Sequence, residues 1–411
     1  MTGQANTTKI RIFSSLQNIA YRRIWIAAWF WYLNRAMEVT ILSWLVLNLT
    51  DSPSQVALVG ISRMSPMFIL GLIAGSVADR FSKRKIMLYL QVVNIVVASI
   101  TLVFIYTGGI TANKVFLSTF CLGLTWALDF ATRRSYFATL FEDFQLPNAV
   151  SLDIALLFMS ILIGPIISGF MISQWGFEFA YGILLLFYLL GLSILITVPR
   201  EPELKQRIIK FGIVQQILEA LTIIRTTRSL WSALTVTVAL NFFGFPFFQM
   251  VPVIARDVLN SNALMYGALI SASGLGSLIA SLFIASKTIR RKHLLYFSGS
   301  LFMLFAIFIF SMSDIYLLSI FSLILAGIGM SAFATMQPTI ALQSVDPTLR
   351  GRAMGAIALG IGAAPPGMWI LGKLSEITNP QFALTTMSIT GFIVIVILGL
   401  LIPELRSKSS D

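Results

Sequence analysis

The stretch Gly75-Ser76-Val77-Ala78-Asp79-Arg80-Phe81-Ser82-Lys83-Arg84-Lys85 joins two long apolar segments, residues 55–78 and 86–107. A helix needs about 20 mostly apolar residues to cross the hydrocarbon core of a bilayer, and each segment provides that length. The charged residues between the segments would lose much favourable hydration if they entered hydrocarbon. The stretch therefore predicts a turn at a membrane surface between two membrane-spanning helices.

The composition extends this interpretation to the whole chain. Of the 411 residues, 57% are hydrophobic and 11% are charged, whereas a soluble domain carries about 25% charged residues. Cys121 is the single cysteine and His293 the single histidine. We interpret Cys121 as a packing residue and His293 as part of a solvated loop. We therefore expect a membrane protein with no disulfide framework, no metal site, no cofactor and no catalytic residues.

Long apolar segments recur along the chain and predict an all-α integral membrane protein with twelve transmembrane helices. The predicted spans are 24–49, 55–78, 86–107, 114–136, 150–173, 177–198, 229–255, 262–286, 294–312, 315–338, 353–374 and 381–403.

The placement of basic residues predicts the orientation. Lys and Arg close to helix ends remain on the cytoplasmic side, and most of the 29 basic residues fall in the two terminal arms and on loops of that side. We expect both termini in the cytoplasm of a multi-pass protein of the cell (inner, cytoplasmic) membrane. The net charge of +12 then reflects topology and contact with anionic lipid, not nucleic acid.

An internal sequence repeat predicts that the chain has two similar halves. The shift that moves Arg84-Lys85 onto Arg291-Lys292 also moves Leu88-Tyr89 onto Leu295-Tyr296 and Asn34 onto Asn241. We expect an N-terminal six-helix bundle at 1–198 and a C-terminal six-helix bundle at 229–411. The charged segment 199–228 would link them, and its residues 208–224 predict an amphipathic helix on the membrane surface.

The opening stretch resembles the signature loop of the major facilitator superfamily, G-x-x-x-D-R-x-G-R-R. Gly75, Asp79, Arg80, Lys83 and Arg84 occupy its positions, while Ser82 replaces the second glycine and Lys83 an arginine. The resemblance implies the major facilitator fold and a gating loop. It places Asp79 at the positive N-terminus of the eleventh helix, near Arg352. The alternative is a loop that only anchors the topology.

Further stretches resemble the subgroup that includes the enterobactin exporter and macrolide efflux proteins. They are Asn34–Glu38, Leu49–Pro53, Asp129–Arg133 and Val251–Asp257. Gly164-Pro165 and Gly169 resemble the fifth-helix motif of drug antiporters, which implies export.

Ionisable residues at membrane depth are usually functional. Arg35 and Glu38 are three residues apart on one helix face and can pair, and Arg63 lies in the next span. We predict that Glu38 takes up a proton, that Arg35 or Arg63 tunes it, and that Asn34 shares the site. A permanent structural ion pair between the first two spans is the alternative. Two basic groups facing one acid also suit an anionic substrate.

A second ion pair is predicted where the fourth span ends. Asp129 precedes Arg133 by four residues, so the two side chains share a helix face. For this ion pair, a structural role is favoured over a functional one.

The second half has no central charge in its predicted spans. Asn241, Phe242 and Phe245 are predicted to form an aromatic cavity wall, although such residues more often pack against lipid. Gly164, Pro165, Gly169, Pro365 and Pro366 are predicted hinge positions, because proline frees a backbone carbonyl and permits bending. A static kink is the alternative at Pro365-Pro366.

These features predict a secondary active transporter, working by alternating access as a proton-coupled exporter of a small amphipathic molecule, drug-like or siderophore-like. We expect a small-molecule substrate, protons as the coupling ion, contact with membrane lipid, and a monomer. Nutrient uptake by symport and a non-transporting receptor on the same scaffold are the alternatives.

Overall fold

A computed structural model describes residues 14–141, 145–199, 227–287, 289–346 and 349–406. At 68–80, 138, 147 and 350–352 it describes the backbone alone. In these ranges the chain is helical and contains no strand. The predicted linker 199–228, with its surface helix at 208–224, lies almost entirely outside the described residues.

The first half of the chain forms five helices after a short 3₁₀ turn, η1 (Ser14–Gln17). They are α1 (Ile19–Thr50), α2 (Pro53–Arg80), α3 (Lys83–Tyr106), α4 (Ala112–Leu140) and α5 (Leu146–Ile196). Asn18 caps α1 by accepting a hydrogen bond from the Tyr21 amide at 3.1 Å, as expected of asparagine at this position.

The second half begins at Arg228 and ends in a short 3₁₀ turn, η3 (Pro403–Leu405). Its helices are α7 (Arg228–Phe243), α8 (Phe247–Asp257), α9 (Ala263–Ala285), α10 (Lys292–Ser311), α11 (Tyr316–Gln343), α12 (Arg350–Ile361), α13 (Ala364–Ile377) and α14 (Pro380–Leu401).

Three sites interrupt the helices. The 51-residue α5 would be about 76 Å long if straight, more than twice the hydrocarbon thickness. It turns at Gly176, whose φ of 83° and ψ of −179° are non-helical. α7 and α8 are separated at Gly244–Pro246, and α12 and α13 at Gly362–Ala363. Each of these two pairs falls within one predicted span.

Nine stretches of the described residues are long and apolar enough to cross a membrane. Large apolar side chains also remain exposed on the helices, such as Tyr89, Leu317 and Leu401 at 70%, 76% and 72%. Exposed apolar surface of this extent suits contact with lipid. The protein is therefore a multi-pass, all-helical membrane protein. The prediction of twelve spans stays a prediction.

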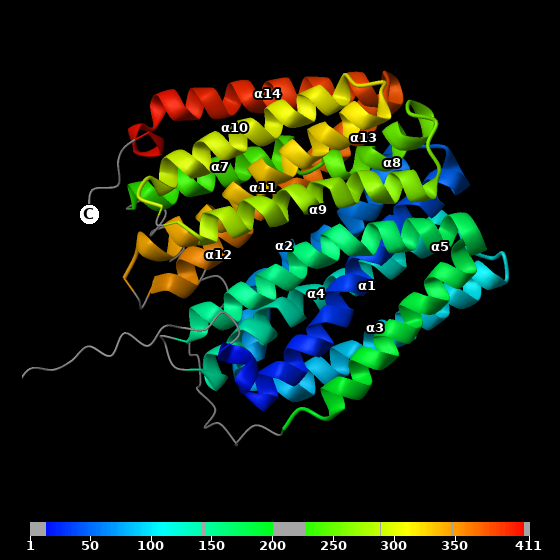
Figure 1. Ribbon diagram of the computed structural model, residues 1–411, viewed down its shortest axis with the longest axis horizontal. Coiled ribbons are helices and arrows are strands. Elements are labelled where there is room, and N and C mark those ends of the chain that lie inside the picture. Colours follow the sequence, from blue (N-terminus) through cyan, green and yellow to red (C-terminus); the bar gives the residue numbers. More distant parts are fainter. Residues whose placement is uncertain (1–13, 142–144, 200–226, 288, 347–348, 407–411) are drawn as a thin grey trace, which may run out of the picture.

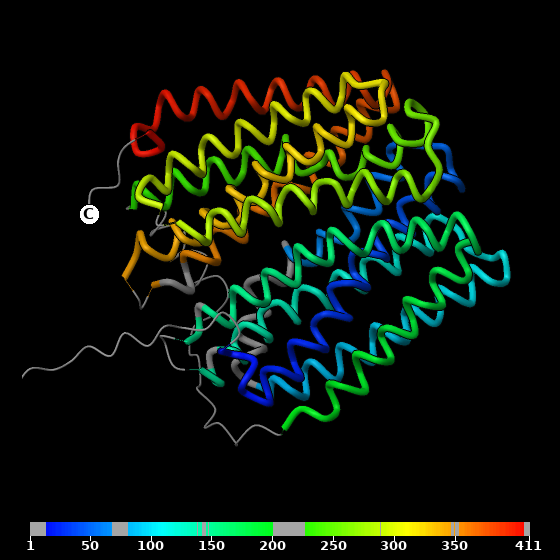
Figure 2. The backbone as a smooth tube through the Cα atoms, viewed as in Figure 1, coloured from blue at the N-terminus to red at the C-terminus, as the bar shows by residue number. Residues whose placement is uncertain are grey.

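The two halves lie side by side and repeat the same packing (Figure 1). α2 packs on α4 as α9 packs on α11, and α3 packs on α5 as α10 packs on α14. Contacts of α5 with α9 and of α2 with α13 join the halves. Figure 2 shows that their helices run along the same long axis of the molecule. We call the end that holds the α1–α2 turn the distal end, because the described part of the chain begins at Ser14 and ends at Arg406 at the other end.

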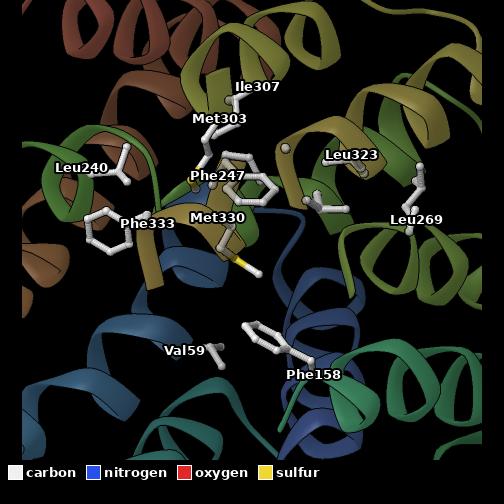
Figure 3. Close-up of a cluster of buried hydrophobic side chains, with 14 of the residues drawn as sticks. Val59, Phe158, Leu240, Phe247, Leu269, Met303, Ile307, Leu323, Met330 and Phe333 are labelled. Carbon is white, nitrogen blue, oxygen red and sulfur yellow. The ribbon is translucent and has the colours of Figure 1, made fainter. Parts of the chain in front are cut away.

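Buried apolar side chains continue from one half into the other (Figure 3). Phe158 of α5 and Val59 of α2 face Met330 and Phe247 of the second half. The core is therefore shared between the halves, and it surrounds the few polar side chains that are buried.

Candidate functional site

The centre of the first half holds a buried carboxylate, that of Glu38 in α1, which is 0% exposed. Its Oε2 accepts a hydrogen bond from Nη1 of Arg63 in α2 at 3.1 Å. Its Oε1 accepts one from the hydroxyl of Tyr181 in α5, also at 3.1 Å. The prediction that Arg35 and Glu38 can pair is wrong for this structure, because the partner comes from the neighbouring helix.

Two glycines set the helix spacing around this carboxylate. A Cβ on Gly123 of α4 would clash with the Arg63 carbonyl and lie 3.0 Å from Cγ of Pro66. A Cβ on Gly164 of α5 would lie 2.8 Å from that of Ala36. Glycine permits such close backbone approach between membrane helices. The absent side chains therefore bring α4 against α2 and α5 against α1, where the charges lie.

Arg35 lies close to the Glu38–Arg63 ion pair but forms no ion pair with Glu38. Its guanidinium carbon is 3.8 Å from the centre of the Trp126 ring in α4, a cation–π geometry. The side chain is half-buried, and no carboxylate among the described residues bonds it. The neighbouring Asn34 is 0% exposed, and both polar atoms of its amide have no hydrogen-bond partner there.

A second polar cluster lies between α1, α4 and α5. Arg133 donates a hydrogen bond to Asp129 at 2.6 Å, so the predicted pair is present in the structure. Asp153 lies 4.0 Å from Arg133 and accepts a hydrogen bond from the Tyr32 hydroxyl at 2.8 Å. Asp153 was not among the residues predicted from the sequence, although an aspartate inside the apolar segment 150–173 is the same signal that selected Glu38.

The corresponding region of the second half is polar but carries no charge in the residues described. Asn241 donates to the Thr237 carbonyl at 2.9 Å, and Gln337 donates to the Thr237 hydroxyl at 2.9 Å. Phe242 packs edge-to-face on Phe243, with ring centres 4.7 Å apart. A cavity-wall role for Asn241, Phe242 and Phe245 stays a prediction.

The predicted hinge positions divide into two kinds. Pro365 and Pro366 open α13 directly after the break at Gly362–Ala363. Helix α5 instead continues through Pro165, and its break is at Gly176. Gly169 packs so closely on the Ala263 carbonyl of α9 that a Cβ there would clash. Bending at any of these positions stays a prediction.

The predicted gating loop is described only in part. Gly75, Asp79 and Arg80 are described by their backbone alone, and α2, the helix that carries them, contacts α12. Lys83 is buried. Arg84 donates to the carbonyls of Ile196 and Val198, both at 2.7 Å. A gating role for these residues stays a prediction.

These contacts have an electrostatic reason. The last carbonyls of a helix have no partner within it, and together they carry a partial negative charge. Arg23 joins Arg84 there by donating to the Thr197 carbonyl. Two arginines from α1 and α3 therefore hold the end of α5 in the first half.

A polar contact between the halves was not foreseen from the sequence. Arg256 of α8 donates to Asp51 at 2.8 Å and to the Leu47 carbonyl at 3.0 Å, at the end of α1. Ser52 donates to Glu376 of α13 at 3.3 Å. Both contacts lie at the distal end and join α1 and the α1–α2 turn to the second half.

The fold agrees with that of solved transporters. A POT family transporter in complex with 5-aminolevulinic acid superposes with a TM-score of 0.75 at 12% identity, covering 94% of this chain and 96% of that one. A mutant of the nucleoside transporter NupG gives 0.69 at 14%, covering 94% and 100%. The human organic anion transporter MFSD10 (TETRAN) gives 0.69 at 14%, covering 92% and 99%.

The helical architecture is thus the fold that these solved transporters share. Residues 10–411 match the family described as transmembrane secretion effector, and the chain belongs to that family. No curated protein matches the chain.

Proposed function

We propose that the protein is a proton-coupled exporter of a small amphipathic molecule and works by alternating access. In this proposal twelve helices cross the cell inner membrane as two six-helix bundles, with both termini in the cytoplasm. The twelve comprise α1, α2, the two segments of α5, and the remaining spans, with α7–α8 and α12–α13 each counted as one.

The observation that carries the proposal is the buried Glu38 carboxylate with its two donors. A carboxylate at this depth is strongly disfavoured unless it is paired or protonated. Arg63 and Tyr181 come from different helices, so a relative movement of α1, α2 and α5 would remove donors and favour protonation. Proton uptake at Glu38 would then be coupled to rearrangement of the bundle.

Export is tested with inverted membrane vesicles energised by an inside-acid pH gradient and a panel of fluorescent amphipathic dyes. Vesicles with the wild-type protein should accumulate at least one dye, and a protonophore should abolish the accumulation. Glu38→Gln should lose it while eluting as a folded protein. Glu178→Gln, a matched change of an exposed carboxylate, should keep it.

The other outcomes discriminate the alternatives. Full gradient-driven accumulation by Glu38→Gln would rule out the proton role. Gradient-driven movement in the opposite direction would favour uptake by symport. Absence of any transport by wild-type protein across the panel would favour a receptor.

The proposed orientation is tested by labelling a cysteine. In a Cys121→Ser background, a cysteine at Ser82, between α2 and α3, should react with a membrane-impermeant maleimide only after permeabilisation. A cysteine at Thr111, before α4, should react in intact cells. The reverse pattern would overturn the orientation.

A further inference from the structure

The charges immediately around Glu38 do not balance. Arg35 and Arg63 lie within electrostatic range of Glu38, so two guanidinium groups share the site with one carboxylate. Both carboxylate oxygens of Glu38 already accept a hydrogen bond, one from Arg63 and one from Tyr181. Arg35 is therefore a cation without an acidic partner among the residues described.

The surroundings of Arg35 differ from those of a structural arginine. A buried structural guanidinium normally has a carboxylate partner, as Arg133 has in Asp129, although Nε and Nη1 of Arg133 have no hydrogen-bond partner among the described residues. Arg35 instead lies over the Trp126 ring and is half-buried. Its guanidinium has no ion pair with any of the residues described.

A second unsatisfied group lies next to Arg35 in the chain. Asn34 is fully buried, and neither its amide oxygen nor its amide nitrogen has a partner among the described residues. A buried amide without hydrogen bonds is destabilising. Neighbouring residues of a helix point about 100° apart, so Asn34 marks a second unsatisfied polar group in this part of α1, on a different face from Arg35.

We propose that Arg35 binds the anionic group of the transported molecule, and that this molecule is an amphipathic organic carboxylate. The inference rests on the proposed transport function and names its substrate class. A planar carboxylate accepts two parallel hydrogen bonds from a guanidinium and supplies the missing negative charge. Trp126 acts as a positioning residue, because its ring packs against the guanidinium.

The test measures binding to the purified full-length protein by isothermal titration calorimetry. The probes are aryl carboxylates of increasing size, each paired with its neutral amide: 2-naphthoate with 2-naphthamide, and biphenyl-4-carboxylate with its carboxamide. Wild-type protein should bind at least one carboxylate about 10- to 100-fold more tightly than its amide, because a hydrogen-bonded charge adds that much affinity. Arg35→Gln should abolish this preference, and Arg35→Lys should keep part of it.

The matched control is Arg134→Gln. Arg134 also stacks on an aromatic ring of α4, with its guanidinium carbon 4.0 Å from the centre of Phe130. This variant removes the same charge from a similar aromatic contact and should leave the carboxylate preference unchanged. Arg35→Lys also serves as the second variant if Arg35→Gln fails to fold, because it keeps the charge but not the planar donor pair.

Three outcomes would overturn the proposal. They are no carboxylate preference in wild-type protein across all probe pairs, an unchanged preference in Arg35→Gln, or an equal loss in Arg134→Gln. The proposed transport function fails separately, when wild-type vesicles move no dye. A protein that exports dyes with no dependence on Arg35 would keep the transport function and lose the substrate class.

Discussion

At the scale of single residues, the arrangement around Glu38 shows how a membrane interior holds charge. Arg63 and Tyr181 satisfy one carboxylate oxygen each. Removing one member of a buried ion pair leaves the other charge without compensation, whereas removing both leaves no charge to compensate. The pair is therefore tested by changing its members singly and together.

Arg63→Met should lower the free energy of unfolding by about 3–5 kcal/mol, because it leaves the Glu38 carboxylate buried with only the Tyr181 hydroxyl. Adding Glu38→Gln to this variant should restore most of the loss. Thermal unfolding in detergent measures both effects. A double variant that is as unstable as the sum of the single changes would show that the two residues are not coupled.

In the second cluster, around Arg133, we expect the two aspartates to contribute unequally to stability. Asp129→Asn should destabilise the protein more than Asp153→Asn, by about 1–2 kcal/mol in the same measurement. Asp129 makes the short charged hydrogen bond to Arg133, whereas Asp153 lies 4.0 Å from it; charged hydrogen bonds contribute more than neutral ones. Equal effects would contradict this division.

At the scale of helices, small residues decide how close the two halves come. Gly169 packs on the Ala263 carbonyl, and Gly267 on the Pro165 carbonyl, along the contact between α5 and α9. Gly274 continues this contact, since a Cβ there would lie 2.6 Å from the Leu162 amide nitrogen. Backbone atoms cannot yield as a flexible side chain can, so a methyl group would separate the helices.

Gly267→Ala should therefore destabilise the protein by about 1–3 kcal/mol, the usual effect of overpacking, and should lower transport. Gly182→Ala is the matched control, because no atom lies within 4 Å of the added Cβ. Alanine favours helix by up to about 1 kcal/mol over glycine, so the control should be neutral or stabilising. Thermal unfolding and vesicle transport measure the two variants, and equal losses in both would refute the packing argument.

At the scale of the whole molecule, the polar contacts described between the halves lie at the distal end. Arg256 neutralises the end of α1 by binding Asp51 and the Leu47 carbonyl, a favourable place for a cation. Ser52 and Glu376 add a hydrogen bond between the α1–α2 turn and α13. Alternating access would require these contacts to break when the distal end opens.

A cross-link between cysteines at Ser52 and Glu376, in a Cys121→Ser background, should hold the distal end closed. The two native side chains are in hydrogen-bonding contact at 3.3 Å, so a short bifunctional thiol reagent with a cleavable disulfide should join them. Vesicle transport should fall to background and recover when the link is reduced. Undiminished transport by fully cross-linked protein would show that this end does not open.

From the sequence alone, the apolar segments and the signature loop determined the class of protein and several of its unusual residues. Segment length and charge placement predicted a helical membrane protein, because transfer into lipid and helix formation are local properties. The major facilitator type was predicted by the resemblance of residues 75–85 to the signature loop of that family. The same local reasoning selected Glu38, Arg63, Asp129 and Arg133 as unusual, since a charge in an apolar segment is visible without a structure.

Tertiary structure alone decided which of these residues meet. Spacing along α1 suggested that Arg35 pairs with Glu38, but packing brought Arg63 and Tyr181 to the carboxylate and left Arg35 on Trp126. It also brought Arg256 to Asp51 across the halves. Helical periodicity fixes neighbours on one helix, whereas partners on other helices depend on close backbone approach at positions such as Gly123 and Gly164, which the sequence does not pair.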